Sequence, residues 1–109
     1  MAWLVRGDDV LAVAEIAMTR PQRRKGLLGR DDFEGVLVLR PCRQIHTFRM
    51  RFPIDVAFCD REGCVLHAAT LGPWRLSRPV PRAKFAIEAS AGAFDRWKLA
   101  VGDVDEVRD

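Results

Sequence analysis

The sequence contains no tyrosine, two histidines and three cysteines in 109 residues. The cysteines, Cys42, Cys59 and Cys64, are odd in number and have no CxxC spacing, so a disulfide framework is not expected. A reducing, cytoplasmic setting fits that pattern. No apolar run approaches the ~20 residues of a membrane span. The apolar stretch ending at Val5 is also too short for the core of a signal peptide.

The composition predicts one domain, residues 1–109, with a single core. Hydrophobic residues make up 49% and charged residues 30%, which is typical of a globular protein. The charge is uneven, because residues 20–51 carry nine arginines and lysines against three acidic residues. We expect these cations to form a solvated surface; alternatively, they attract an anionic ligand or, weakly, nucleic acid.

The stretch from Cys42 to Gly63 organises the chain. Between residues 42 and 52, mostly apolar side chains hold the even positions and arginines recur at the odd ones. This period of two predicts a strand that continues, after a kink at Pro53, to Phe58. Residues 60–63 predict a tight turn, because the last of them is a glycine, and residues 64–70 predict the returning strand.

The other segments predict further short elements. We expect strands at residues 3–5, 10–18, 36–39, 83–89 and 104–107, a helix at 20–28, and a second helix capped by Ser90 that includes Phe94, Trp97 and Leu99. The expected fold is therefore α+β and β-dominated. It is a single compact, barrel-like antiparallel sheet of six or seven short strands with two short helices.

Several motifs carry a family resemblance through their order and spacing. They are KGLLGR (25–30), HTFRMRFPIDV (46–56), DREG (60–63), GPWR (72–75), the strand around Glu88 leading to AG (91–92), and VGDV (101–104). Together they resemble, from about Val10 onward, the bacterial and archaeal family numbered 192 in the domain-of-unknown-function series. The resemblance implies a compact, β-rich, barrel-like domain and supplies no established activity. Many relatives carry Lys-Asn where this chain has Arg51-Phe52.

Six residues form the candidate ligand site: His46, Thr47, Arg49, Asp55, Trp74 and Arg75. Asp55 lies in an apolar strand, so its carboxylate must be paired or solvated. It either bonds backbone N–H groups or an arginine, or it lines a polar pocket; Glu15 and Glu88 raise the same question. Trp74 and Arg75 lie in a loop after Gly-Pro, where Trp74 either plugs the end of the barrel or contacts a partner.

The sequence gives little support to metal or nucleophile chemistry. Cys42, His46 and Met50 are soft ligands, but residues four apart on a strand are ~13 Å from each other, so we expect no metal site and no cofactor. A cysteine, Cys42 or Cys59, paired with His46 or His67 as nucleophile and base lacks a flanking signature.

The balance of these features favours a non-enzymatic binding module for an anionic small molecule or a protein partner, with no membrane partner. Two alternatives stay open. One is a small hydrolase-like enzyme in which Asp55 and His46 act as acid and base. The other is a weak nucleic-acid binder that uses the arginine-rich face.

Overall fold

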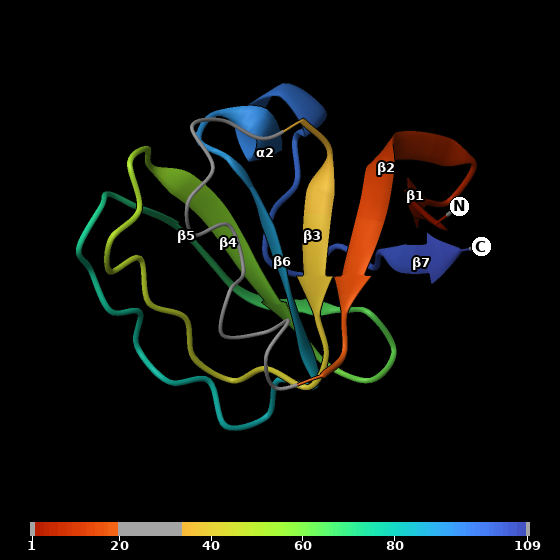
Figure 1. The fold of residues 1–109 in the computed structure, drawn as a ribbon. Helices are drawn as coiled ribbons and strands as arrows, with labels where there is room; N and C mark the ends of the chain where they lie inside the picture. The colour runs from red at the N-terminus through yellow and green to blue at the C-terminus, as the bar shows by residue number, and fades with distance from the viewer. Residues whose placement is uncertain (1, 20–33, 109) are drawn as a thin grey trace.

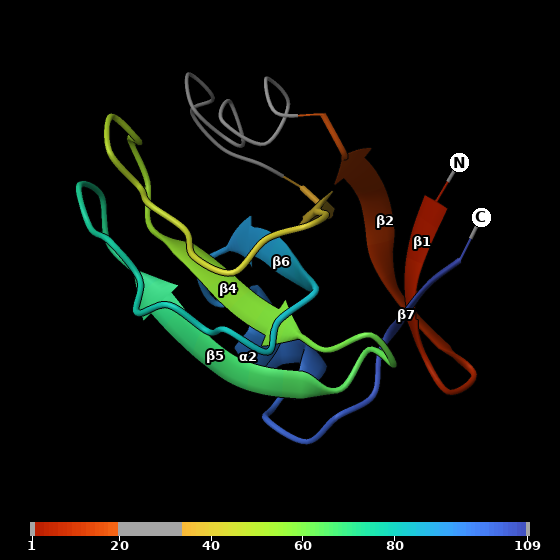
Figure 2. The ribbon, with the colours of Figure 1, turned by 90° about the horizontal axis from the view of Figure 1, so that it is seen from below.

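The computed structural model describes residues 2–19 and 34–108, which contain seven strands and one short helix (Figure 1). The elements are β1 (Ala2–Arg6), β2 (Asp9–Ala17), β3 (Val36–Leu39), β4 (Ile54–Cys59), β5 (Val65–Leu71), β6 (Phe85–Ser90), α2 (Ala93–Trp97) and β7 (Glu106–Arg108). All strands join one sheet in the order β5-β4-β6-β3-β2-β1-β7. The sheet curls into a half-barrel (Figure 2), so the β-dominated, barrel-like class is confirmed.

Two details differ from the sequence prediction, namely the pairing of β2 with β3 and the bounds of the second helix, which ends at Trp97 and does not include Leu99. The sheet is antiparallel except for β2 and β3, which pair in parallel. The helix α2 has Gly92 as its N-cap, with φ of +96°, whereas Ser90 is the last residue of β6. It is the one helix among the described residues, and the helix predicted at 20–28 lies outside them. No helix in the described part of the chain is long and apolar enough to cross a membrane.

The predicted strand over residues 42–52 is wrong. This segment is an irregular loop, and at its centre the buried face is the opposite of the predicted one. The odd residues Ile45 and Thr47 are buried, whereas the even residues His46 and Phe48 are exposed. Strand structure begins only at Ile54, after Pro53.

Proline and a left-handed residue explain the failure of this alternating pattern. Pro41 and Pro53 bound the segment, and neither can donate a hydrogen bond to a ladder. Arg49 has φ of +67°, which breaks the extended backbone between them. The segment 40–53 instead bonds to a second loop, residues 72–84, and we call these two segments the paired loops.

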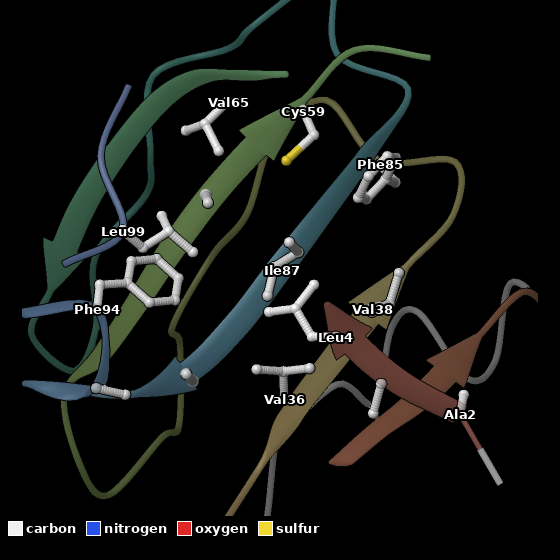
Figure 3. Packing of buried hydrophobic residues seen from close by; sticks show 14 residues of the cluster. Ala2, Leu4, Val36, Val38, Cys59, Val65, Phe85, Ile87, Phe94 and Leu99 are labelled. Carbon is white, nitrogen blue, oxygen red and sulfur yellow. The ribbon is translucent and has the colours of Figure 1, made fainter. Parts of the chain in front are cut away.

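The central strands are buried on both faces, because a hydrophobic cluster lies on each side of the sheet. The first cluster lies on the side of α2 and includes Leu4, Val36, Ile87, Phe94 and Leu99 (Figure 3). The second lies on the other side and includes Leu39, Val56 and Phe58 from the sheet, with Ile45, Met50 and Val80 from the paired loops. Burial on both faces explains the nearly continuous apolar sequences of β3, β4 and β6.

The segment before β7 draws the two edges of the half-barrel together. The turn at residues 60–63, predicted from the sequence, is confirmed and brings Gly63 to the backbone of Asp105, whose N–H donates to Gly63 O at 3.0 Å. Val65 N donates to Asp103 O at 2.8 Å, while β7 itself pairs with β1. Arg6 adds an ion pair with Asp103 at 3.1 Å.

Replacement of Gly63 by alanine should destabilise the protein strongly. The backbone oxygen of Asp105 occupies the place that a Cβ would take, and φ at Gly63 is +89°. We expect Gly63→Ala to lower the free energy of unfolding by ~3 kcal/mol or more, measured by urea denaturation. Gly7→Ala is the matched control, because Gly7 has φ of +60° and nothing within 4 Å of a new Cβ. It should cost only ~1 kcal/mol, and an equal loss in both variants would contradict this account.

Candidate functional site

Thr47 joins the paired loops from the inside. Its side chain is fully buried, and its hydroxyl donates to Gly72 O at 2.6 Å and accepts from Arg75 N at 2.8 Å. Its backbone N–H donates to Arg75 O at 2.8 Å, and its carbonyl accepts from Trp74 N at 2.9 Å and Met50 N at 3.1 Å. Thr47 therefore fixes the geometry of the site without facing a ligand.

Two further ties continue this pairing along the loops. Ile45 N donates to the Ser77 hydroxyl at 2.9 Å, and Ser77 N donates back to Ile45 O at 2.8 Å. Val80 N donates to Arg43 O at 2.8 Å. Since buried backbone groups are costly to leave unpaired, these bonds hold the two loops as one unit over the second cluster.

Aromatic side chains gather on the outer surface of this unit. The rings of His46 and Phe48 are stacked with centroids 4.9 Å apart, and those of Phe48 and Trp74 are tilted at 6.4 Å. We call these three residues the aromatic row. Trp74 is 62% exposed, so it does not plug the end of the barrel. The Nδ1 atom of His46 accepts from Phe48 N at 3.3 Å, which assigns the proton of a neutral ring to Nε2.

One residue of the aromatic row, Trp74, and the neighbouring Arg49 have strained backbones. Arg49 and Trp74 have φ of +67° and +62°, which is unusual for residues with a Cβ. Such conformations cost of the order of 1–3 kcal/mol and concentrate at functional sites. Because the bonds of Thr47 enforce these turns, part of the folding free energy is used to present Arg49 and Trp74 at the surface.

All charged residues of the paired loops are basic. They carry eight basic residues and no acidic residue. The basic residues are Arg40, Arg43, Arg49, Arg51, Arg75, Arg78, Arg82 and Lys84, and all eight are exposed. Nearly half of the 18 arginines and lysines of the chain thus lie in two adjoining segments, where their fields add and attract anions.

Asp55 serves the scaffold. It is 3% exposed; one carboxylate oxygen accepts from the Thr70 hydroxyl at 2.7 Å, and the other accepts from the backbone N–H groups of Gly92 at 2.9 Å and Phe94 at 3.1 Å. The carboxylate therefore caps α2 from a neighbouring strand. These contacts support the role of Asp55 in bonding backbone N–H groups, and Asp55 also lines a cavity beside Thr70 and Lys98.

The three residues considered for acid–base work do not share a site. On β4, Asp55 lies on the same face as Ala57, which belongs to the first cluster; on β6, Glu88 lies on the same face as Ala86, which belongs to the second. The two carboxylates thus point to opposite sides of the sheet. Within the described chain, no hydrogen bond joins His46 to either of them.

Two buried carboxyl groups have raised pKa values. Burial raises the pKa of Glu88 to about 8, and Oε1 of Glu88 has no hydrogen-bond partner among the described residues. Burial and the nearby Asp103 raise the pKa of Asp105 to about 6, against the opposing effect of Arg6. The sequence identifies Glu88 as a carboxylate that needs a partner or solvent, but it does not identify Asp105. The position of Asp105 depends on the hydrogen bond from its N–H to Gly63 O.

The cysteine chemistry considered from the sequence gains no support. Burial, followed by the charges of Asp105 and Asp60, raises the pKa of the Cys59 thiol to about 12, so it is not a thiolate near neutral pH. The thiol of Cys42 bonds to Gln44 O at 3.4 Å. No group of three His, Cys, Asp or Glu side chains that could hold a metal ion occurs within residues 2–19 and 34–108.

The structure brings four of the six candidate residues to one surface and separates two. His46, Arg49, Trp74 and Arg75 are exposed on the paired loops, while Thr47 and Asp55 are buried in the framework. The sequence missed Phe48, which is 41% exposed in the aromatic row although the alternating pattern placed it on a buried face. The prolines at 41 and 53 were the available signal that this pattern would not form a strand.

The fold places the chain among small β-rich domains built on a curled sheet, and the comparisons agree. A crystal structure of a protein of unknown function from Novosphingobium aromaticivorans DSM 12444 has the same fold, with a TM-score of 0.82 at 20% identity, covering 96% of this chain and 82% of that one. A UPF0127 protein of Pyrococcus abyssi is 35% identical over 94 residues, covering 82% of this chain and 80% of its own length. A UPF0127 protein of Pyrococcus horikoshii is 41% identical over 59 residues, which are 54% of this chain and 51% of its own length.

The family follows from a match that spans almost the whole chain. Residues 3–107 match the model of DUF192, whose description is "Uncharacterized ACR". The chain belongs to this family, so the resemblance seen in the sequence is confirmed. The family description assigns no activity.

Loss of the Asp55 carboxylate should destabilise the fold. Asp55→Ala leaves the N–H groups of Gly92 and Phe94 and the Thr70 hydroxyl without their acceptor, so we expect unfolding to become easier by ~3 kcal/mol or more. Asp95→Ala is the control, because Asp95 is an exposed acid in the first turn of the same helix and should cost ~1 kcal/mol at most. A small effect at position 55, measured by urea denaturation, would show that the cap is dispensable.

Glu88 should make stability fall as pH rises. Its pKa of about 8 lies above the ordinary 4.5, so the folded state favours the protonated form. This contribution is fully present below pH 4.5 and is lost as pH rises through 8. Between pH 7 and 8, we expect the free energy of unfolding to drop by ~1 kcal/mol, and Glu88→Gln to flatten that slope.

The window between pH 7 and 8 separates Glu88 from the other shifted groups, because the Cys59 thiol, whose pKa is raised from 9.0 to about 12, affects stability only at higher pH. Asp105 titrates at about 6, and the pKa of His67 is lowered from 6.5 by burial and by Arg78. Glu62→Gln, at an exposed residue of the turn before β5, is the matched control and should keep the slope of the parent protein. If Glu88→Gln also keeps that slope, Glu88 is not the titrating group.

Proposed function

We propose that this protein is a non-enzymatic binding module that holds an anionic partner on the outer surface of the paired loops. One observation carries the proposal: two loops with eight cations and no acid are hydrogen-bonded into one unit that exposes the aromatic row. Clustered arginine and aromatic side chains are the composition of binding hot spots. An anionic partner is the complement of this charge.

The backbone geometry supports binding at this surface. Arg49 and Trp74 keep a costly left-handed conformation and both project from the loops. Four of the residues considered from the sequence, His46, Arg49, Trp74 and Arg75, would contact the partner, together with Phe48. Thr47 would act by holding both loops in register, through the bonds described above.

The contacts of the acidic residues favour binding over hydrolysis. A general base needs a lone pair within reach of the substrate. Asp55 lies on the face of the sheet opposite to the paired loops, and three hydrogen bonds already hold its carboxylate in place. We therefore assign binding, and no catalytic step, to the aromatic row and the arginines of the paired loops.

Binding of inorganic polyphosphate, a linear polyanion without other chemistry, tests the proposal by calorimetry. We expect affinity to fall steeply between about 50 and 200 mM salt, because bound phosphates release counterions. The double variant Arg75→Glu/Arg78→Glu should weaken binding by roughly tenfold or more. It should also make the slope of log affinity against log salt shallower by about 1.5.

The double variant Arg61→Glu/Arg96→Glu is the matched control. It makes the same change in net charge at two exposed arginines that lie outside the paired loops, in the β4–β5 turn and on α2. Binding close to that of the parent protein would assign the site to the paired loops. Equal losses of affinity in the two variants would show that net charge, and not the position of the arginines, determines binding. The absence of polyphosphate binding by the parent protein would refute the proposal.

A further inference from the structure

The aromatic row gives the paired loops a second recognition chemistry beside charge. Resting on the proposed function, we infer that the anionic partner is a single-stranded nucleic acid. Its bases stack on the open ends of the row, at Trp74 and His46, while the arginines of the paired loops bind its phosphates. Sequence-tolerant binders of single strands combine these two elements, a cationic track and stacking rings.

The geometry of the rings fits base stacking. His46 and Phe48 are stacked with an interplanar angle of 24°, and Trp74 continues the row at 32° to Phe48. Phe48 lies between its two neighbours and supports both of them. Trp74 is 62% exposed and His46 is also exposed, so a planar base can extend the row at either end.

The cations favour phosphate as the charged group. Seven of the eight basic residues of the paired loops are arginines, and one is a lysine. The guanidinium group binds two phosphate oxygens in a fork and also stacks on bases, whereas an ammonium acts as a point charge. The seven arginines of the paired loops can therefore bind phosphate oxygens in this way.

The paired loops offer little to an acidic peptide or to a duplex. Their N–H groups at Thr47, Trp74, Arg75, Ser77 and Val80 already donate to the opposite loop, so these groups are not available to an extended peptide. The one helix among the described residues, α2, has five residues and buries Phe94 in the first cluster, on the other side of the sheet. It is too short and too covered to enter a major groove. A single-stranded nucleic acid, in contrast, can be bound by exposed side chains alone.

The experiment compares a labelled oligothymidylate of about 12 nucleotides with an abasic strand of the same phosphate count, by fluorescence anisotropy at fixed salt. We expect the oligothymidylate to bind the full chain roughly tenfold or more tightly than the abasic strand. Trp74→Gly, which removes the ring and accepts the positive φ, should bring the oligothymidylate close to the abasic value. Circular dichroism checks that the variant is folded.

Leu76→Ala is the matched control for loss of the ring. Leu76 is 58% exposed in the same loop and carries no aromatic ring, so the variant should keep the preference for bases. His46→Ala removes the other end of the row and should reduce the same preference, so the test does not depend on the folding of Trp74→Gly. A peptide of about 12 glutamates provides an acidic competitor without phosphates or bases.

The results distinguish the nucleic-acid inference from the proposed anion site. Preferential binding of bases that both ring variants reduce supports the inference. Equal binding of both strands, or a preference for bases that survives in both ring variants, overturns the nucleic-acid inference and leaves the proposed anion site standing. Tighter binding of the glutamate peptide than of the oligothymidylate also overturns the inference, while absence of binding to any polyanion refutes both proposals.

Discussion

A sheet whose strands are apolar on both faces is stable in water only when other segments of the chain pack against both faces. In this protein β3, β4 and β6 form such a centre, and α2 with its flanking residues covers one side. The other side has the paired loops, which insert Ile45, Met50 and Val80 into the second cluster. An irregular cover is stable only if its buried backbone groups find partners, and Thr47 supplies several of them at one point. The same bonds that protect the core therefore position the site.

The sequence was sufficient for the class of fold and insufficient for the site. Short apolar strands, the turn at residues 60–63 and the family motifs led to a β-dominated, barrel-like domain, which the sheet and the family match confirm. The error at residues 42–52 arose because alternation describes which side chains are buried, and an irregular cover can alternate as well as a strand. Its phase was also reversed, with Phe48 outside and Thr47 inside, since loop-to-loop bonds decided the register. No local pattern encodes bonds between residues about 25 positions apart.

Several residues of this domain are maintained at a cost to stability. Arg49 and Trp74 hold left-handed backbones, and Glu88 places a carboxyl group in an apolar layer with one oxygen unpartnered among the described residues. Local rules are broken most often where function constrains a chain, so these positions stand apart from the regular strands. Arg49 and Trp74 lie on the cationic surface, whereas Glu88 lies beneath it, on the same side of the sheet. Departures also occur elsewhere, at Lys98, with φ of +54°, and at Asp105, whose two carboxylate oxygens have no partner among the described residues.

The pairing of β1 with β7 joins Trp3 to Arg108, across nearly the full length of the chain. During synthesis, the hairpin of β1 and β2 can form early, but the second edge of β1 has no neighbour until β7 has been made. An exposed strand edge is a template for pairing with other molecules. The three residues of β7 therefore also protect the edge of β1 from pairing with other molecules. Nascent or truncated chains without β7 would be the aggregation-prone forms of this protein.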